Sequence, residues 1–180
     1  MSKIFPRKTP DRDSRYMALA WFHAGFSKDP STQVGAQIVS LDNKPLGSGY
    51  NGPPRTINDE DVIWDRPKKD NFDEISKYDL IIHAEINAIN HCHTNDLNDA
   101  TLYVTALPCP RCMLEIAGKG IGRVVYFDFQ SSKNSSLQNK DWIKKSLEIA
   151  KLANISLEKF SGNLNWMMDW CLQLKQNNLF

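Results

Sequence analysis

The sequence predicts an α/β protein in which helices cover both faces of a sheet, giving three layers. Short extended runs alternate with helical segments along the chain, and the central part contains a strand-helix-strand unit. The extended runs are also rich in β-branched and aromatic residues. With 180 residues, 41% of them hydrophobic, the chain can bury one full core and does not require two. We therefore expect a single domain over residues 1–180.

The first part of the chain predicts a helix followed by a hairpin. Residues 13–26 are apolar almost all round after Ser14, which is typical of a buried helix, and Gly25 and the turn-like "SKDP" end it. Residues 33–40 and 45–50 are short extended runs, and the "LDNK" between them carries an Asp-Asn turn signal. These two runs therefore predict a β-hairpin.

The rest of the chain predicts helices and strands in alternation. In chain order they are a helix after His83, a strand at 101–106, a helix at 110–120, a strand at 122–129, a helix at 140–154, an edge strand at 155–160 and a helix at 164–176. Between the hairpin and these elements, about 28 residues at 53–80 are rich in Pro, Asp and Lys and show little periodicity. Inserts of that length in a compact domain are often functional.

Composition limits the possible functions. A formal net charge of +1 and a pI near 7.7 provide no general attraction for polyanions, so we expect no long nucleic acid partner. No stretch approaches about 20 consecutive apolar residues and the N-terminus lacks an apolar run, so we expect neither a membrane span nor secretion. Four cysteines, of which Cys92 and Cys171 are isolated, do not resemble a disulfide framework. They fit a reducing cytoplasm.

Two short motifs predict a metal site. "HAE" at 83–85 begins a helix, which puts His83 at its N-terminus and Glu85 in its first turn. About 25 residues later, Cys109 and Cys112 of "PCPRC" lie three apart and thus on one helix face. One imidazole and two thiolates make a three-ligand zinc site with a fourth position for water, whereas a structural site would use four protein ligands.

The same motifs predict a hydrolytic reaction. Glu85 is placed to take a proton from the water and to deliver it to a ring nitrogen and a leaving amine. We expect one zinc ion per chain, because His23, His91, Cys92, His93 and Cys171 lack ligand spacing relative to one another. His-x-Glu followed by Pro-Cys-x-x-Cys is the signature of the zinc nucleobase deaminases.

The resemblance extends beyond these motifs. "SKDPSTQVGAQIVS" and "GSGYNGPP", together with "LYVTALPCPRC" and "AGKGIGRVVY", resemble the deoxycytidylate deaminase family over about residues 28–127. This resemblance implies a cytidine-deaminase-like fold with a five-stranded mixed sheet flanked by helices. It also implies zinc-dependent conversion of dCMP to dUMP for thymidylate synthesis, a homo-oligomer that is a hexamer in many members, and feedback by dCTP and dTTP.

The resemblance assigns candidate site residues. It makes His83, Cys109 and Cys112 zinc ligands, Glu85 the proton shuttle, Asn51 a sugar contact, Val34 and Ala84 walls of the base pocket, Lys28 a 5′-phosphate contact, and Arg111 and Gly52 contacts of an effector or of a neighbouring subunit. Simpler interpretations stand beside these. Asn51 precedes a glycine and suits a turn, Val34 and Ala84 suit a core, and Lys28 suits a solvated surface. Some members of the family carry a second zinc before His-x-Glu, but 53–80 contains no Cys or His.

Other functions remain open at this point. The substrate could be another cytosine nucleotide, such as dCTP or a modified dCMP, or a base in single-stranded nucleic acid, against which the neutral charge balance argues. A lone Cys-x-x-Cys could also be a thioredoxin-like redox pair. Finally, the zinc could stabilise a non-enzymatic module, in which Glu85 would have no role.

Overall fold

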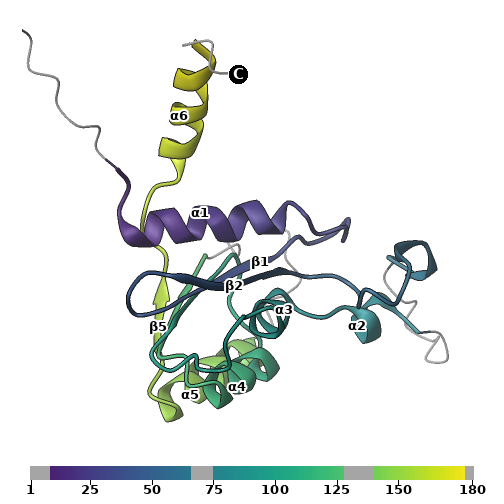
Figure 1. The fold of residues 1–180 in the computed structure, drawn as a ribbon. Helices are drawn as coiled ribbons and strands as arrows, with labels where there is room; N and C mark the ends of the chain where they lie inside the picture. Colours follow the sequence, from purple (N-terminus) through teal and green to yellow (C-terminus); the bar gives the residue numbers. More distant parts are fainter. Residues whose placement is uncertain (1–8, 66–74, 128–139, 177–180) are drawn as a thin grey trace, which may run out of the picture.

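The computed structural model describes residues 9–65, 75–127 and 140–176, and its centre is a five-stranded sheet (Figure 1). The strands are β1 (Gly35–Val39), β2 (Pro45–Tyr50), β3 (Thr101–Val104), β4 (Arg123–Tyr126) and β5 (Ser156–Lys159), in the order β2-β1-β3-β4-β5. β1 runs antiparallel to β2 and β3, whereas β3, β4 and β5 are parallel to one another. The predicted mixed sheet, its hairpin and its edge strand β5 are confirmed.

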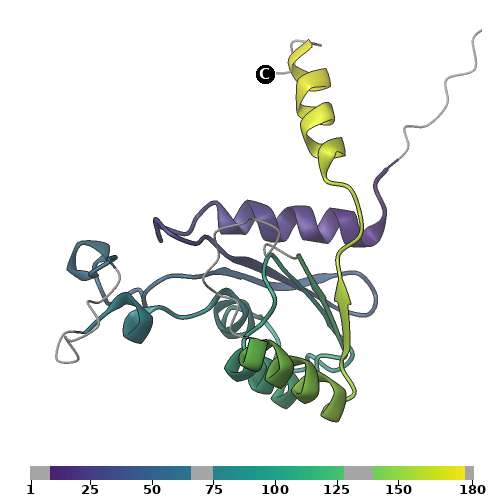
Figure 2. The same ribbon diagram turned by 180° about the vertical axis from the view of Figure 1, so that it is seen from behind.

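Helices cover both faces of this sheet and complete the three predicted layers. α1 (Arg12–Ala24) lies along one face, and α3 (Ala84–Asn90), α4 (Pro110–Gly118) and α5 (Lys140–Leu152) lie on the other (Figures 1 and 2). α6 (Asn165–Gln176) follows β5 and projects away from the sheet on the side of α1. Within the described ranges, no helix combines the length and the apolar composition needed to cross a membrane.

α1 begins where its sequence indicates but is not buried all round. The Asp11 side chain caps it by accepting hydrogen bonds from the Ser14 amide at 2.9 Å and hydroxyl at 2.7 Å. Its inner face packs Met17 against the sheet. On the outer face of α1, Phe22 is 64% exposed, because only the inner face of this helix packs against the sheet. The expectation of a fully buried helix is therefore wrong for that face.

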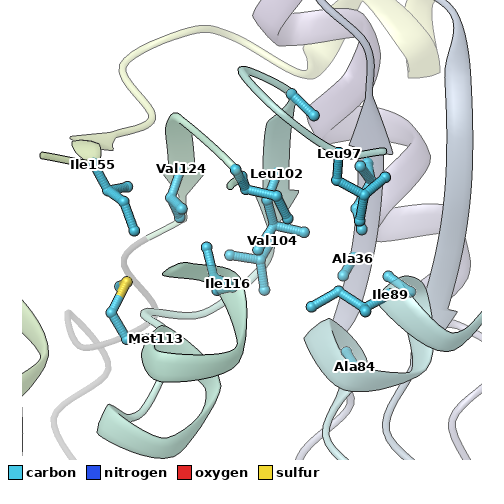
Figure 3. Packing of buried hydrophobic residues seen from close by; sticks show 14 of the residues in the cluster. Ala36, Ala84, Ile89, Leu97, Leu102, Val104, Met113, Ile116, Val124 and Ile155 are labelled. Atoms are coloured by element: carbon cyan, nitrogen blue, oxygen red, sulfur yellow. The ribbon is translucent and has the colours of Figure 1, made fainter. Parts of the chain in front are cut away.

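The main core lies between the sheet and the helices α3 and α4 (Figure 3). Apolar side chains of the three inner strands meet those of both helices there, and the fully buried members include Ile38, Leu102, Val104, Val124, Ala88, Met113 and Ile116. Each large side chain buried in this way stabilises the fold by about 1.5–3 kcal/mol. This core holds the first turns of α3 and α4, which carry the predicted zinc ligands, against one sheet.

Two glycines let helices approach the sheet closely. A Cβ atom at Gly35 would lie 2.0 Å from the backbone oxygen of Ala20 in α1. A Cβ atom at Gly49 would lie 2.3 Å from the backbone nitrogen of Ala88 in α3. Both distances are shorter than any real contact of a side chain, so β1 and β2 touch helix backbone on opposite faces of the sheet.

The polar insert contains structure that its sequence did not predict. A 3-10 helix, η1 (Asp59–Asp61), lies in its first arm, and a four-residue helix, α2 (Lys77–Leu80), lies in its second arm. Ser76 and Asp79 form a capping box at the start of α2. These two short helices are too brief to give a periodic signal in the sequence, and 66–74 lie outside the described residues.

The segments that carry the predicted site lie at one edge of the sheet, which is formed by the start of β1 and the ends of β2 and β3. β1 starts where β2 ends, with Gly35 opposite Tyr50, and Ala36 lies opposite Val104 at the end of β3. The loop before β1, the turn after β2 and the loop from β3 to α4 therefore share this edge. Arg123, at the start of β4, lies at the opposite edge.

Candidate active site

The three predicted zinc ligands converge at this edge of the sheet. His83 caps the N-terminus of α3, Cys109 caps α4, and Cys112 lies in the first turn of α4. The His83 Nδ1 atom is 3.2 Å from Cys112 Sγ and 3.6 Å from Cys109 Sγ, and all three ligand atoms lie within 4.8 Å of one another. One nitrogen and two sulfur atoms at this spacing fit a zinc ion, which binds imidazole at about 2.0–2.1 Å and thiolate at about 2.3 Å.

The electrostatics of the cluster also suit a cation. A hydrogen bond from Cys112, and further ones that include His83, lower the pKa of the Cys109 thiol to about 4. The hydrogen bond to Cys109 and burial raise the pKa of Cys112, so that thiol holds the proton. The lowered pKa of Cys109 favours its thiolate form, and binding of a cation would release the proton of Cys112.

Glu85 lies beside the cluster in a buried position. It is in the first turn of α3, two residues after His83, and its exposed fraction is 4%. Burial raises the pKa of this carboxyl group. The charge of His83 lowers this pKa, and the charge of Cys109 raises it. A buried carboxyl with a raised pKa next to a metal site is suited to accept and return protons.

The structure gives Asn51 a definite set of contacts. Its amide Nδ2 donates to the Thr32 carbonyl at 3.0 Å, and its Oδ1 accepts from the Val34 amide at 2.8 Å. Its backbone carbonyl accepts from Ser27 Oγ at 2.8 Å. The buried Asn51 side chain therefore fixes the loop 27–34 and uses one of its two Nδ2 hydrogens to do so. The predicted sugar contact is untested and stays a prediction.

Lys28 also lies in the loop 27–34, and its side chain contacts the insert. The ammonium forms an ion pair with Asp59 of η1, and 66% of the Lys28 side chain is exposed. The pKa of Lys28 is raised by the hydrogen bond and the charge of Asp59. The predicted phosphate contact therefore has a competing carboxylate in this structure.

The remaining candidates occupy three different environments. Ala84 is fully buried and belongs to the main core, where it follows His83 directly. Gly52 is buried and pairs with Ile82 through two backbone hydrogen bonds of 2.9 and 3.1 Å, which joins the turn after β2 to the residue before His83. Arg111 is exposed in the first turn of α4. Their roles in binding stay predictions.

The "HCH" segment does not form a second metal site. The His91 ring nitrogen lies 3.2 Å from the Ser48 carbonyl, and Cys92 Sγ donates to the carbonyl of Ala88. Over residues 9–65, 75–127 and 140–176, the only group of three converging metal-binding side chains is His83, Cys109 and Cys112.

One pair of buried residues escaped prediction altogether. Lys77 of α2 and Asp29 of the loop 27–34 form an ion pair with exposed fractions of only 3% and 6%. Nothing in a single sequence links two residues 48 positions apart. The capping motif that begins at Ser76 was the available signal for α2, because Ser-x-x-Asp is typical of a helix start.

Comparisons with known proteins agree with this geometry. A sequence profile of the cytidine and deoxycytidylate deaminase zinc-binding region matches residues 10–128. Over 129 residues the chain is 40% identical to deoxycytidylate deaminase of Pongo abelii, covering 70% of this chain and 71% of that protein. It is 36% identical over 146 residues to the enzyme of Mus musculus, covering 81% of this chain and 78% of that protein.

A solved structure shares the fold. The dCMP deaminase from the cyanophage S-TIM5, in complex with dCMP and dUMP, superposes with a TM-score of 0.62 at 22% sequence identity. The alignment covers 86% of this chain and 100% of that chain.

Proposed function

Because the chain belongs to the cytidine and deoxycytidylate deaminase family, we propose that it catalyses the hydrolytic deamination of dCMP to dUMP, which supplies dUMP for thymidylate synthesis. The observation that carries this proposal is the convergence of His83, Cys109 and Cys112 beside the buried carboxyl of Glu85. Relatives named deoxycytidylate deaminase, aligned over 70% or more of the chain, direct the choice of substrate.

In this reaction, three residues bind the metal and a fourth transfers protons. His83, Cys109 and Cys112 would hold one zinc ion per chain, leaving its fourth position open. Bound there, the zinc would lower the pKa of a water molecule and so supply a nucleophile at neutral pH. As the oxygen of a water molecule bonds to C4 of cytosine, Glu85 would take one proton from that water and pass it to N3. Glu85 would then take the second proton from the same oxygen and pass it to the amine, and the C4–N bond would break to release ammonia. Burial raises the pKa of the Glu85 carboxyl, which favours uptake of a proton.

The loop 27–34 and the turn after β2 bind the nucleotide in this proposal. Asn51 contacts the sugar with its side-chain amide, and Val34 and Ala84 border the base. Lys28 contacts the 5′-phosphate after exchanging Asp59 for it. The support for this arrangement is that these segments share one edge of the sheet with Cys109.

The larger organisation is part of the same proposal. Residues 1–180 act as one catalytic domain, and copies of the chain assemble into a homo-oligomer, a hexamer as the family resemblance implies. dCTP and dTTP act as effectors, with Arg111 and Gly52 as contacts of an effector or a neighbouring subunit. A cytoplasmic location agrees with the four cysteines, which are all unpaired.

A substrate panel tests the function. The zinc-loaded protein is assayed with dCMP, deoxycytidine, dCTP, 5-methyl-dCMP and a cytosine-containing oligonucleotide, following the change in ultraviolet absorbance on deamination. We expect dCMP to have the highest kcat/KM. Preferred turnover of the oligonucleotide would replace the proposal with a nucleic acid deaminase, and no turnover of any substrate would favour a structural zinc module.

A further inference from the structure

The two arms of the polar insert are attached to consecutive residues of one loop. Lys28 pairs with Asp59 in the first arm, and Asp29 pairs with Lys77 in the second. The first pair is largely exposed, whereas the side chains of the second are 4% and 8% exposed. The buried pair is therefore the firm attachment.

Every donor of the Lys77 ammonium has a partner in the loop. Nζ donates to Asp29 Oδ1 at 2.9 Å, to Asp29 Oδ2 at 3.2 Å and to Ser31 Oγ at 2.9 Å. An ammonium has three hydrogens, so these contacts satisfy it completely. Asp29 Oδ1 also accepts from the backbone amides of Ser31 at 2.8 Å and Thr32 at 3.3 Å. The Asp29 carboxylate thus orders the loop 27–34 and also binds the insert through Lys77.

The same loop leads directly to the catalytic edge. Thr32 and Val34 bond to the Asn51 amide, and Gly52 beside it pairs with Ile82, the residue before the zinc ligand His83. The helix α2, which begins at Lys77, ends at Leu80, and the chain then runs directly into Ile82 and His83. The pair therefore closes a ring of contacts: loop 27–34, Asn51, Gly52, Ile82, α2 and back to the loop.

Stability alone is a poor explanation for such a pair. Removing two charges from water costs several kcal/mol per ion, and well-packed apolar replacements of buried pairs are often as stable or more stable. Five hydrogen bonds to the Asp29 carboxylate and the Lys77 ammonium instead hold the two groups in a single geometry.

We propose that Asp29 and Lys77 are positioning residues for nucleotide binding, and that through them the insert fixes the position of the loop that contacts the substrate. This inference rests on the proposed deamination of dCMP.

Steady-state kinetics and thermal unfolding, measured together, test the proposal. The main variant is the double replacement Asp29→Leu and Lys77→Met, which removes both charges and leaves no buried ion unpaired. We expect a melting temperature near that of the wild type, a KM for dCMP raised about tenfold, as for the loss of a charged hydrogen bond, and a kcat within about threefold. If the pair serves only to stabilise the fold, a double variant with a melting temperature near that of the wild type should also have the wild-type KM.

Arg123→Met is the matched control. It breaks a partly buried ion pair network with Asp13 and Glu158 at the opposite edge of the sheet. We expect it to lower the melting temperature and to leave the KM for dCMP unchanged. An equal rise of KM in this control would overturn the proposal, because any loss of stability would then have the same effect.

A milder variant covers the case in which the double variant does not fold. Ser31→Ala removes one acceptor of Lys77, on an exposed residue, and we expect it to raise KM about threefold, as for one neutral hydrogen bond. A wild-type KM in folded Ser31→Ala overturns the proposal in that case. If the wild-type protein does not deaminate dCMP, the proposed function fails as well; if it does and the variants bind normally, only the positioning role fails.

Discussion

Lys28 and Asp59 form an ion pair across 31 residues of sequence, with one partner in the loop before β1 and the other in the polar insert. The lysine proposed to contact the substrate phosphate is therefore paired with a carboxylate of the insert. An exposed pair of this kind is weak because solvent screens both charges, so a phosphate dianion can displace the carboxylate.

This relationship predicts opposite effects for the two partners. Lys28→Ala should raise the KM for dCMP and leave the KM for deoxycytidine unchanged, because only the nucleotide carries the phosphate. Asp59→Asn should lower the KM for dCMP about two- to fivefold, since it removes the competitor at the cost of a surface pair. Initial rates with both substrates measure this. A higher KM in Asp59→Asn would show that the carboxylate orients Lys28 and does not compete.

A second prediction concerns the proton carrier. Glu85→Gln keeps the shape of the buried side chain but cannot carry a proton, so kcat should fall by about 10²–10⁴ while zinc content and melting temperature change little. Glu115→Gln, on the exposed face of α4, is the control and should behave as the wild type. Turnover near the wild-type rate in Glu85→Gln would rule out the proposed mechanism.

A third prediction concerns the metal. Purified protein should contain one zinc per chain, measured by plasma mass spectrometry. Cys109→Ala and Cys112→Ala should each lose it, because a three-ligand site has none to spare. Cys92→Ala removes a half-buried thiol outside the cluster and should keep it. Two zinc ions per chain would mean that a second site exists outside this group.

A fourth prediction is a pH dependence at the edge remote from the site. Hydrogen bonds from Arg123 lower the pKa values of Asp13 and Glu158 in the folded protein. Carboxyl groups with lowered pKa values stabilise the fold above their unfolded values of about 4, and this stabilisation is lost as the pH falls through the folded values. The melting temperature of the wild type should therefore exceed that of Arg123→Met most at pH 7, and the difference should shrink below about pH 4. A constant difference from pH 7 to pH 3 would contradict the linkage.

A fifth prediction concerns regulation. If dCTP and dTTP are effectors of an oligomer, dCMP saturation curves should shift in opposite directions with the two nucleotides. An effector that prefers one state about tenfold supplies about 1.4 kcal/mol of coupling, which is enough to move such a curve measurably. Light scattering in parallel gives the number of chains. A monomer whose curve does not move with either nucleotide would remove the regulatory part of the proposal.

Local patterns were sufficient to predict most of the fold and the three side chains, His83, Cys109 and Cys112, that the structure brings together. His83, Cys109 and Cys112 were predicted because the spacing of each motif places its ligands at a helix start, and the alternation of strands and helices then required a common sheet. α1 was misjudged because apolar residues such as Phe22 look alike whether they face a core or an open surface.

Contacts between distant segments could not be predicted. Asn51 was expected to contact a sugar, and its hydrogen bonds to Thr32 and Val34 depend on a loop whose shape is set by tertiary contacts. The pairing of Asp29 with Lys77 depends in turn on how the insert folds back. Neither leaves a periodic signal in one sequence, because each joins single residues and not repeating faces.

The close approach at Gly35 and Gly49 has a consequence for how this protein tolerates variation. Neither glycine has a reactive group, yet any side chain at Gly49 would push against the backbone of α3, the helix that carries Glu85. In a scan of all single substitutions, we expect these two positions to tolerate few replacements. Intolerance at such a position reports crowding between the backbone of a strand and that of a helix, and it would arise here beside the predicted site without any chemical role for the glycine.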